Sequence, residues 1–97
     1  MPDVLSPEQV DHLLGSELPH WSRDGDAVVR AVESETFALG IRLVDAVAVV
    51  ADELNHHPDM DIRWTTVTFR LSTHSAGGIT DNDIELAKRI DTLADQR

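Results

Sequence analysis

The sequence contains no cysteine at any of its 97 positions. Disulfide bonds and thiolate catalysis are therefore excluded, and the usual sulfur ligands of structural zinc are missing. Because disulfides are typical of secreted and periplasmic proteins, we expect this chain to work in a reducing cytoplasm.

Basic residues are scarce, with 8 Lys and Arg against 18 Asp and Glu, which gives a formal net charge of -10. Such a chain repels phosphate backbones and anionic lipid, so we expect no direct binding to nucleic acid or to membranes. No segment approaches the roughly 18 consecutive apolar residues of a membrane-spanning helix. The opening "MPDVLSPEQV" has no basic region followed by an apolar run, so we expect no export signal.

Aromatic residues are also few, at 4% of a chain of which 41% is hydrophobic. A chain of this length and composition predicts one small domain, spanning residues 1–97, with a two-layer core. With so few aromatic side chains available, Trp21 and Trp64 are expected to pack in the core or to anchor an interface.

Capping signals predict the first and last helices. Ser6 is a candidate N-cap with Gln9 three residues later, and Gly15 is the predicted end of that helix. Thr80 is the second candidate N-cap, and Asp83 at the third helical position is its expected capping-box acceptor rather than a catalyst. A long amphipathic helix is predicted between Thr36 and Pro58, with its apolar face at Ile41, Val44, Val47, Ala48, Ala51 and Leu54.

Two hairpins fill the remaining segments. Asp24-Gly25 marks the first turn, followed by a strand over residues 27–34, and a change of apolar phase requires the second turn near Thr65-Thr66. The predicted order is helix–strand–strand–helix–strand–strand–helix. This order indicates an α+β fold, a four-stranded antiparallel sheet with helices packed on one face.

The candidate chemistry lies around a histidine pair at the end of the long helix. Asp52 precedes His56 by four residues, so on a helix its carboxylate would lie one turn below the imidazole. His57 would project about 100° away around the same helix end. The pair could therefore flank a ligand from two sides.

A third histidine, His74, is expected to close the second strand of the later hairpin. Strict alternation would point it to the same face as Ser72, away from the apolar face. The hydroxyl groups of Ser72, Thr73 and Ser75 could donate or accept hydrogen bonds there. The glycines that follow would let the backbone approach a flat ligand closely.

Simpler interpretations compete with this one. His12 and His20 are expected to be solvated surface residues. Three histidines could form an open zinc site, but the usual spacing of four or five residues between ligands is missing, so no metal is expected. His56 could also act only on the helix dipole as a C-capping residue, which would leave His74 unexplained.

The 32-residue stretch "DELNHHPDMDIRWTTVTFRLSTHSAGGITDND" resembles the pterin-4a-carbinolamine dehydratases. The spacing of its signature positions agrees with active members throughout, and the resemblance covers nearly the whole chain. The signature positions are Asp52, His56, His57, Pro58, Trp64, His74 and Asp83.

The resemblance implies the removal of water from 4a-hydroxytetrahydropterin, giving quinonoid dihydropterin, in the recycling of a tetrahydropterin cofactor. On this resemblance we expect His56, held by Asp52, and His57 to act as general acid and base. His74 would position the ring or share the acid role. The residues implied to border the pterin are Asn55, Ser72, Thr73 and Ser75. It further implies a homodimer or homotetramer, with neither metal nor organic cofactor. The alternatives are a non-catalytic dimerisation or protein-binding module on the same fold and a metal-dependent hydrolase.

Overall fold

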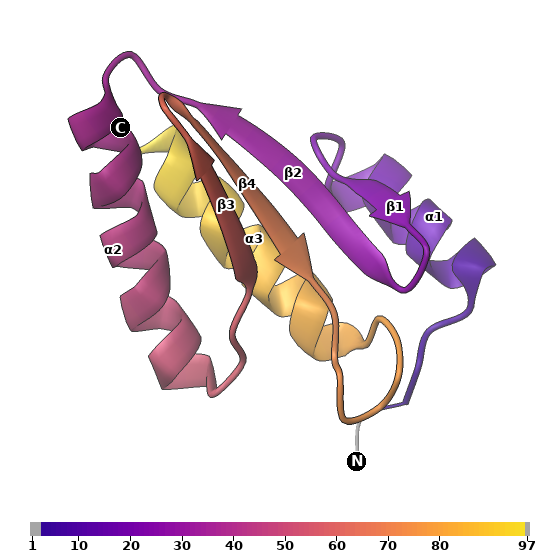
Figure 1. Ribbon diagram of the computed structural model, residues 1–97. Helices are drawn as coiled ribbons and strands as arrows, with labels where there is room; N and C mark the ends of the chain where they lie inside the picture. Colours follow the sequence, from indigo (N-terminus) through magenta and orange to yellow (C-terminus); the bar gives the residue numbers. More distant parts are fainter. Residues whose placement is uncertain (1–2, 97) are drawn as a thin grey trace.

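A computed structural model describes residues 3–96, so residues 1, 2 and 97 of the expected domain lie outside the described part. The polypeptide forms three helices and four strands in the predicted order (Figure 1). Their bounds are α1 Pro7–Glu17, β1 Ser22–Asp24, β2 Ala27–Glu33, α2 Phe37–Leu54, β3 Asp59–Arg63, β4 Thr66–Leu71 and α3 Asp81–Asp95.

The strands form one antiparallel sheet in the order β1-β2-β4-β3, so the two hairpins meet along β2 and β4. The three helices cover one face of this sheet, with α3 running behind the central strands and α2 beside it (Figure 1). The predicted α+β fold is therefore confirmed. None of the helices in the described residues combines the length and hydropathy needed to cross a membrane.

The core lies between the helix-covered face of the sheet and the buried stripes of α2 and α3. Phe69 at the centre of β4 is completely buried, and Val28 and Val67 lie on the same face. Each such side chain contributes about 1.5–3 kcal/mol by leaving water. The helices supply the other half of this core, chiefly Leu43, Val47, Val50, Ile84, Leu86, Ala87 and Ile90.

The first helix differs from its predicted end at Gly15, since it continues to Glu17 and is capped at Leu18. Leu14 and Leu18 on either side of the glycine are buried in the core. Glycine within a helix costs about 1 kcal/mol relative to alanine. The burial of two leucines outweighs that cost, so this glycine does not terminate the helix.

Both hairpin turns lie one residue away from the predicted pairs. Asp24 pairs with Ala27 across the first hairpin, which leaves Gly25-Asp26 as the turn, and Gly25 has a φ of 61°. The second turn is Trp64-Thr65, with Trp64 at a φ of 52° and 80% exposed. Trp21, in contrast, is buried in the core, as expected of a packing residue.

Candidate active site

The site begins where α2 ends, in a reversal of the chain at Asn55. Asn55 adopts the left-handed conformation, with φ 50° and ψ 43°. Its N–H donates to the carbonyl of Asp52 at 3.2 Å, and the N–H of His56 donates to the carbonyl of Ala51 at 3.0 Å. This pair of bonds is the Schellman arrangement, which asparagine tolerates better than most residues. The chain therefore leaves the helix axis before the histidines.

Because of this reversal, His56 and His57 are not part of the helix, and helical spacing does not describe them. The prediction that Asp52 lies below His56 is wrong. Asp52 instead meets His57, with 2.9 Å between Oδ1 and Nε2. The side chains of His57 and Asp52 are 58% and 80% exposed, so water screens this pair.

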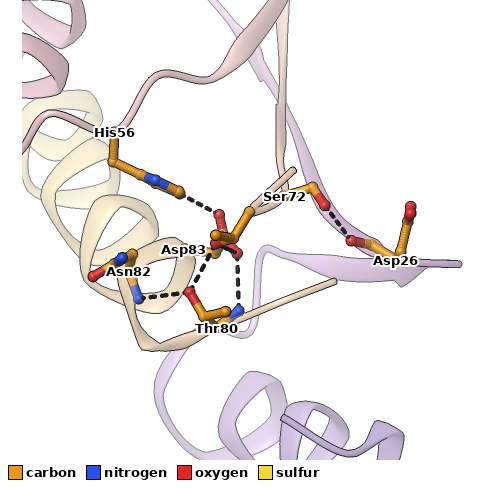
Figure 2. Close-up of polar contacts among 7 residues, drawn as sticks. Asp26, His56, Ser72, Thr80, Asn82 and Asp83 are labelled. Carbon is orange, nitrogen blue, oxygen red and sulfur yellow. Dashed lines mark hydrogen bonds and ion pairs between the residues drawn. The ribbon is translucent and has the colours of Figure 1, made fainter. Parts of the chain in front are cut away.

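His56 turns inward and contacts an aspartate 27 positions further along the chain. Its Nε2 lies 2.5 Å from Oδ1 of Asp83 at the start of α3 (Figure 2). The His56 side chain is only 13% exposed and Asp83 is fully buried. Water screens this pair far less than the Asp52–His57 pair, so it fixes the position of the imidazole more firmly.

The second oxygen of Asp83 faces the protein. Oδ2 accepts the N–H of Thr80 at 2.9 Å, which completes the predicted capping box, and accepts the hydroxyl of Thr73 at 2.8 Å. The capping role of Asp83 is therefore confirmed, but it is only half of what the carboxylate does. A capping box uses one carboxylate oxygen, so the other was free for a partner that sequence reasoning missed.

The loop between β4 and α3 carries the remaining predicted residues. Thr73 is bridged to Gly78, and the turn between them contains His74 and Ser75, both of which are exposed. Gly77 closes the turn with a φ of 78°, a conformation that glycine adopts at little cost. Because His74 directly follows Thr73, the Asp83 carboxylate joins the histidine end of α2 to the start of this loop.

The predicted pterin-bordering hydroxyls differ in their surroundings. The hydroxyl of Ser72 donates to the carbonyl of Asp26 at 2.7 Å (Figure 2). Thr73 is 4% exposed, and its hydroxyl bonds to Asp83. Ser75, in the turn after Thr73, and Asn55, next to His56 in the sequence, are both exposed. His12 and His20 are also exposed, which confirms the surface location predicted for them.

Within residues 3–96, no group of three or more His, Cys, Asp or Glu side chains is arranged to hold a metal ion. Hollows of about 210 and 240 Å³ on the described surface are lined by other residues, one around Val4 and Gly78 and one around Met60 and Arg70. The candidate site is thus the open surface around His56, with a buried carboxylate beneath it.

Known proteins share this fold. A crystal structure described as a transcriptional coactivator/pterin dehydratase from Brucella melitensis matches with a TM-score of 0.90 and 26% identity, over 95% of this chain and 99% of that one. A pterin dehydratase-like protein described as a RuBisCO assembly factor in the alpha-carboxysome matches with a TM-score of 0.63 and 21% identity, over 76% and 86%. The fold is therefore that of the pterin dehydratases.

Relatives with similar sequences identify the family within this fold. A protein of Nocardia farcinica is 55% identical over 92 residues, covering 95% of this chain and 96% of its own. One of Mycolicibacterium smegmatis is 51% identical over 90 residues, covering 93% and 95%. Both are named provisionally as pterin-4-alpha-carbinolamine dehydratases. The family model for pterin 4 alpha carbinolamine dehydratase matches residues 3–93, so the chain belongs to this family of hydro-lyases.

Proposed function

We propose that this protein dehydrates 4a-hydroxytetrahydropterin to quinonoid dihydropterin and water, a step in tetrahydropterin cofactor recycling, by histidine acid–base catalysis. Family membership supports the reaction. The observation that carries the mechanism is the contact between His56 and the buried Asp83, because a proton-transferring imidazole held by a buried carboxylate is a recurrent catalytic unit.

The reaction needs two proton movements and no change of oxidation state. One proton is delivered to the 4a-hydroxyl oxygen as the C–O bond breaks, so that water leaves. A second proton is withdrawn from the neighbouring ring nitrogen, whose electron pair forms the new double bond to the carbon. Imidazole groups suit both movements because histidine gains and loses a proton near neutral pH.

We assign these movements to three histidines around the pterin ring. His56 is held from behind by Asp83, and His57 is paired with Asp52 on the solvent side. His74, on the exposed turn after Thr73, would approach the ring from the loop. Support from Asp52 would thus reach His57 rather than His56.

We assign the borders of the pterin to two segments, the end of α2 and the turn after Thr73. Asn55 and Ser75 are exposed, and Ser72 directly follows β4 with its hydroxyl bonded to the carbonyl of Asp26. Thr73 belongs to the same border by position alone, since its hydroxyl is bonded to Asp83 and its backbone N–H and carbonyl are bonded within the turn.

The decisive experiment is stopped-flow dehydration of chemically generated 4a-hydroxytetrahydropterin with the purified full chain. We expect an acceleration that saturates with substrate concentration, because binding must precede proton transfer. Free imidazole at the same total histidine concentration is the matched control for solution acid–base catalysis. An acceleration no greater than that of free imidazole, or one that stays linear in substrate, would rule out the proposed enzyme.

We also propose that the chain forms a homodimer or homotetramer. Large apolar side chains are exposed on the single chain, a feature that marks interaction surfaces. Four of them lie on α2 and on the β3–β4 hairpin, at Phe37, Val49, Ile62 and Trp64, and Val4 precedes α1. Sedimentation velocity should give two or four times the chain mass of 10.7 kDa. A species of single-chain mass at micromolar concentration would contradict the proposal. The exposed apolar side chains would then be a binding surface for a different protein.

A further inference from the structure

A chain of buried hydrogen bonds runs behind His56. The N–H of Asn82 donates to the hydroxyl oxygen of Thr80 at 3.2 Å, and the hydroxyls of Thr80 and Thr73 lie 2.7 Å apart. The hydroxyl of Thr73 lies 2.8 Å from Oδ2 of Asp83, whose Oδ1 meets Nε2 of His56. Thr73, Thr80 and Asp83 are 4%, 0% and 0% exposed, so the middle of this chain is shielded from bulk water.

The direction of these bonds follows from the number of protons available. Each threonine hydroxyl carries one proton, and a carboxylate carries none. If the Thr73 hydroxyl donates its hydrogen bond to Asp83, then the Thr80 hydroxyl must donate to the oxygen of Thr73. The oxygen of Thr80 in turn accepts from the N–H of Asn82. The opposite direction would leave the Thr80 hydroxyl proton buried without an acceptor, which costs about 1–3 kcal/mol. The first direction, in contrast, gives each of the two hydroxyl protons an acceptor.

An ionised Asp83 carboxylate can only accept hydrogen bonds, at both of its oxygens. Oδ2 accepts two hydrogen bonds, one from the Thr73 hydroxyl and one from the Thr80 N–H. Oδ1 of the ionised carboxylate accepts from Nε2 of His56, so the proton of the imidazole lies on Nε2. The nitrogen left to face a substrate is Nδ1, since the hydrogen bond at one ring nitrogen determines which form the other takes.

We propose that Thr73 and Thr80 are positioning residues that act through Asp83 to fix His56 in its Nε2–H form, so that Nδ1 is the atom that exchanges a proton with the pterin. This inference rests on the proposed dehydratase function for its substrate. Thr73 therefore contributes through its hydroxyl to the state of His56 rather than through a hydrogen bond from that hydroxyl to the pterin.

His57 provides an internal comparison. Its Nε2 meets Asp52, whose carboxylate is 80% exposed, so water competes for this contact. We expect neutral His57 to exchange between its two tautomers, while neutral His56 holds one. The two adjacent histidines can be observed in the same spectrum, so each sample carries its own reference.

The test is a two-bond ¹H–¹⁵N correlation spectrum of the ¹⁵N-labelled full chain, recorded where the histidines are neutral. For His56 we expect a pyrrole-type Nε2 and a pyridine-type Nδ1, and for His57 averaged signals. Thr73→Val, which keeps the shape but removes the hydroxyl, should move the His56 signals toward the averaged pattern. Thr73→Ser, which restores the hydroxyl, should return them.

Dehydration rates complete the test. Thr73→Val should lower kcat by about 10-fold or more, as loss of an orienting partner typically does, and Thr73→Ser should recover most of the loss. A wild-type spectrum with His56 averaged or protonated on Nδ1 overturns the inference even if dehydration is fast, and it needs no variant to fold. Absent dehydration with His56 fixed on Nε2 would instead overturn the proposed function and with it the role of Nδ1.

Discussion

Replacing His56 with alanine is expected to lower the rate of pterin dehydration by about 10²–10⁴-fold, the contribution typical of a positioned general acid or base. His56 is the least exposed of the three site histidines, and it is the one bonded to a buried carboxylate. Its position is therefore the most firmly fixed, and water replaces it least well. The measurement is stopped-flow kcat at saturating substrate.

The matched control is His12→Ala, which removes an exposed imidazole from α1 and should leave kcat unchanged. The His56→Ala protein should first be checked for a native spectrum, because the substitution takes a partner from Asp83. If a folded His56→Ala protein keeps the wild-type rate, His56 has no part in proton transfer. The mechanism would then have to be carried by the two exposed histidines.

Replacing Asp83 with alanine is expected to lower the free energy of unfolding by at least about 2 kcal/mol, because two buried donors lose their acceptor at about 1–3 kcal/mol each. Those donors are the Thr80 N–H and the Thr73 hydroxyl. The capping box of α3 is lost at the same time. Urea denaturation followed by circular dichroism measures the change.

Asp81→Ala is the matched control, since Asp81 lies in the same first turn of α3 but is exposed. Its loss removes only a favourable charge near the helix dipole, worth less than about 1 kcal/mol. Equal losses of stability in the two variants would mean that the buried bonds of Asp83 contribute nothing beyond helix-end electrostatics.

The architecture could be predicted because its signals are local. Ser6 and Thr80 each carry a capping box that marks a helix start, and the change from a two-residue to a 3.6-residue period separates β2 from α2. The predicted position of the first turn is one residue off because both Asp24-Gly25 and Gly25-Asp26 satisfy turn chemistry. Only the pairing of Asp24 with Ala27 decides between them.

The pairing of the candidate site residues could not be predicted from their spacing in the sequence. The spacing rule that placed Asp52 below His56 assumes that the helix continues, and the left-handed Asn55 ends it one residue earlier. Asparagine two residues after a helical Glu53 and three before Pro58 is a signal for such an end. The His56–Asp83 contact has no local signal, because the partners are 27 positions apart with a whole hairpin between them.

One carboxylate thus starts a helix and holds an imidazole. In a relative of this chain without catalysis the histidines could be lost, yet an aspartate at position 83 would still contribute to the capping box of α3. In comparisons among relatives, an aspartate at that position therefore reports on the scaffold, and only the imidazole opposite it reports on the chemistry.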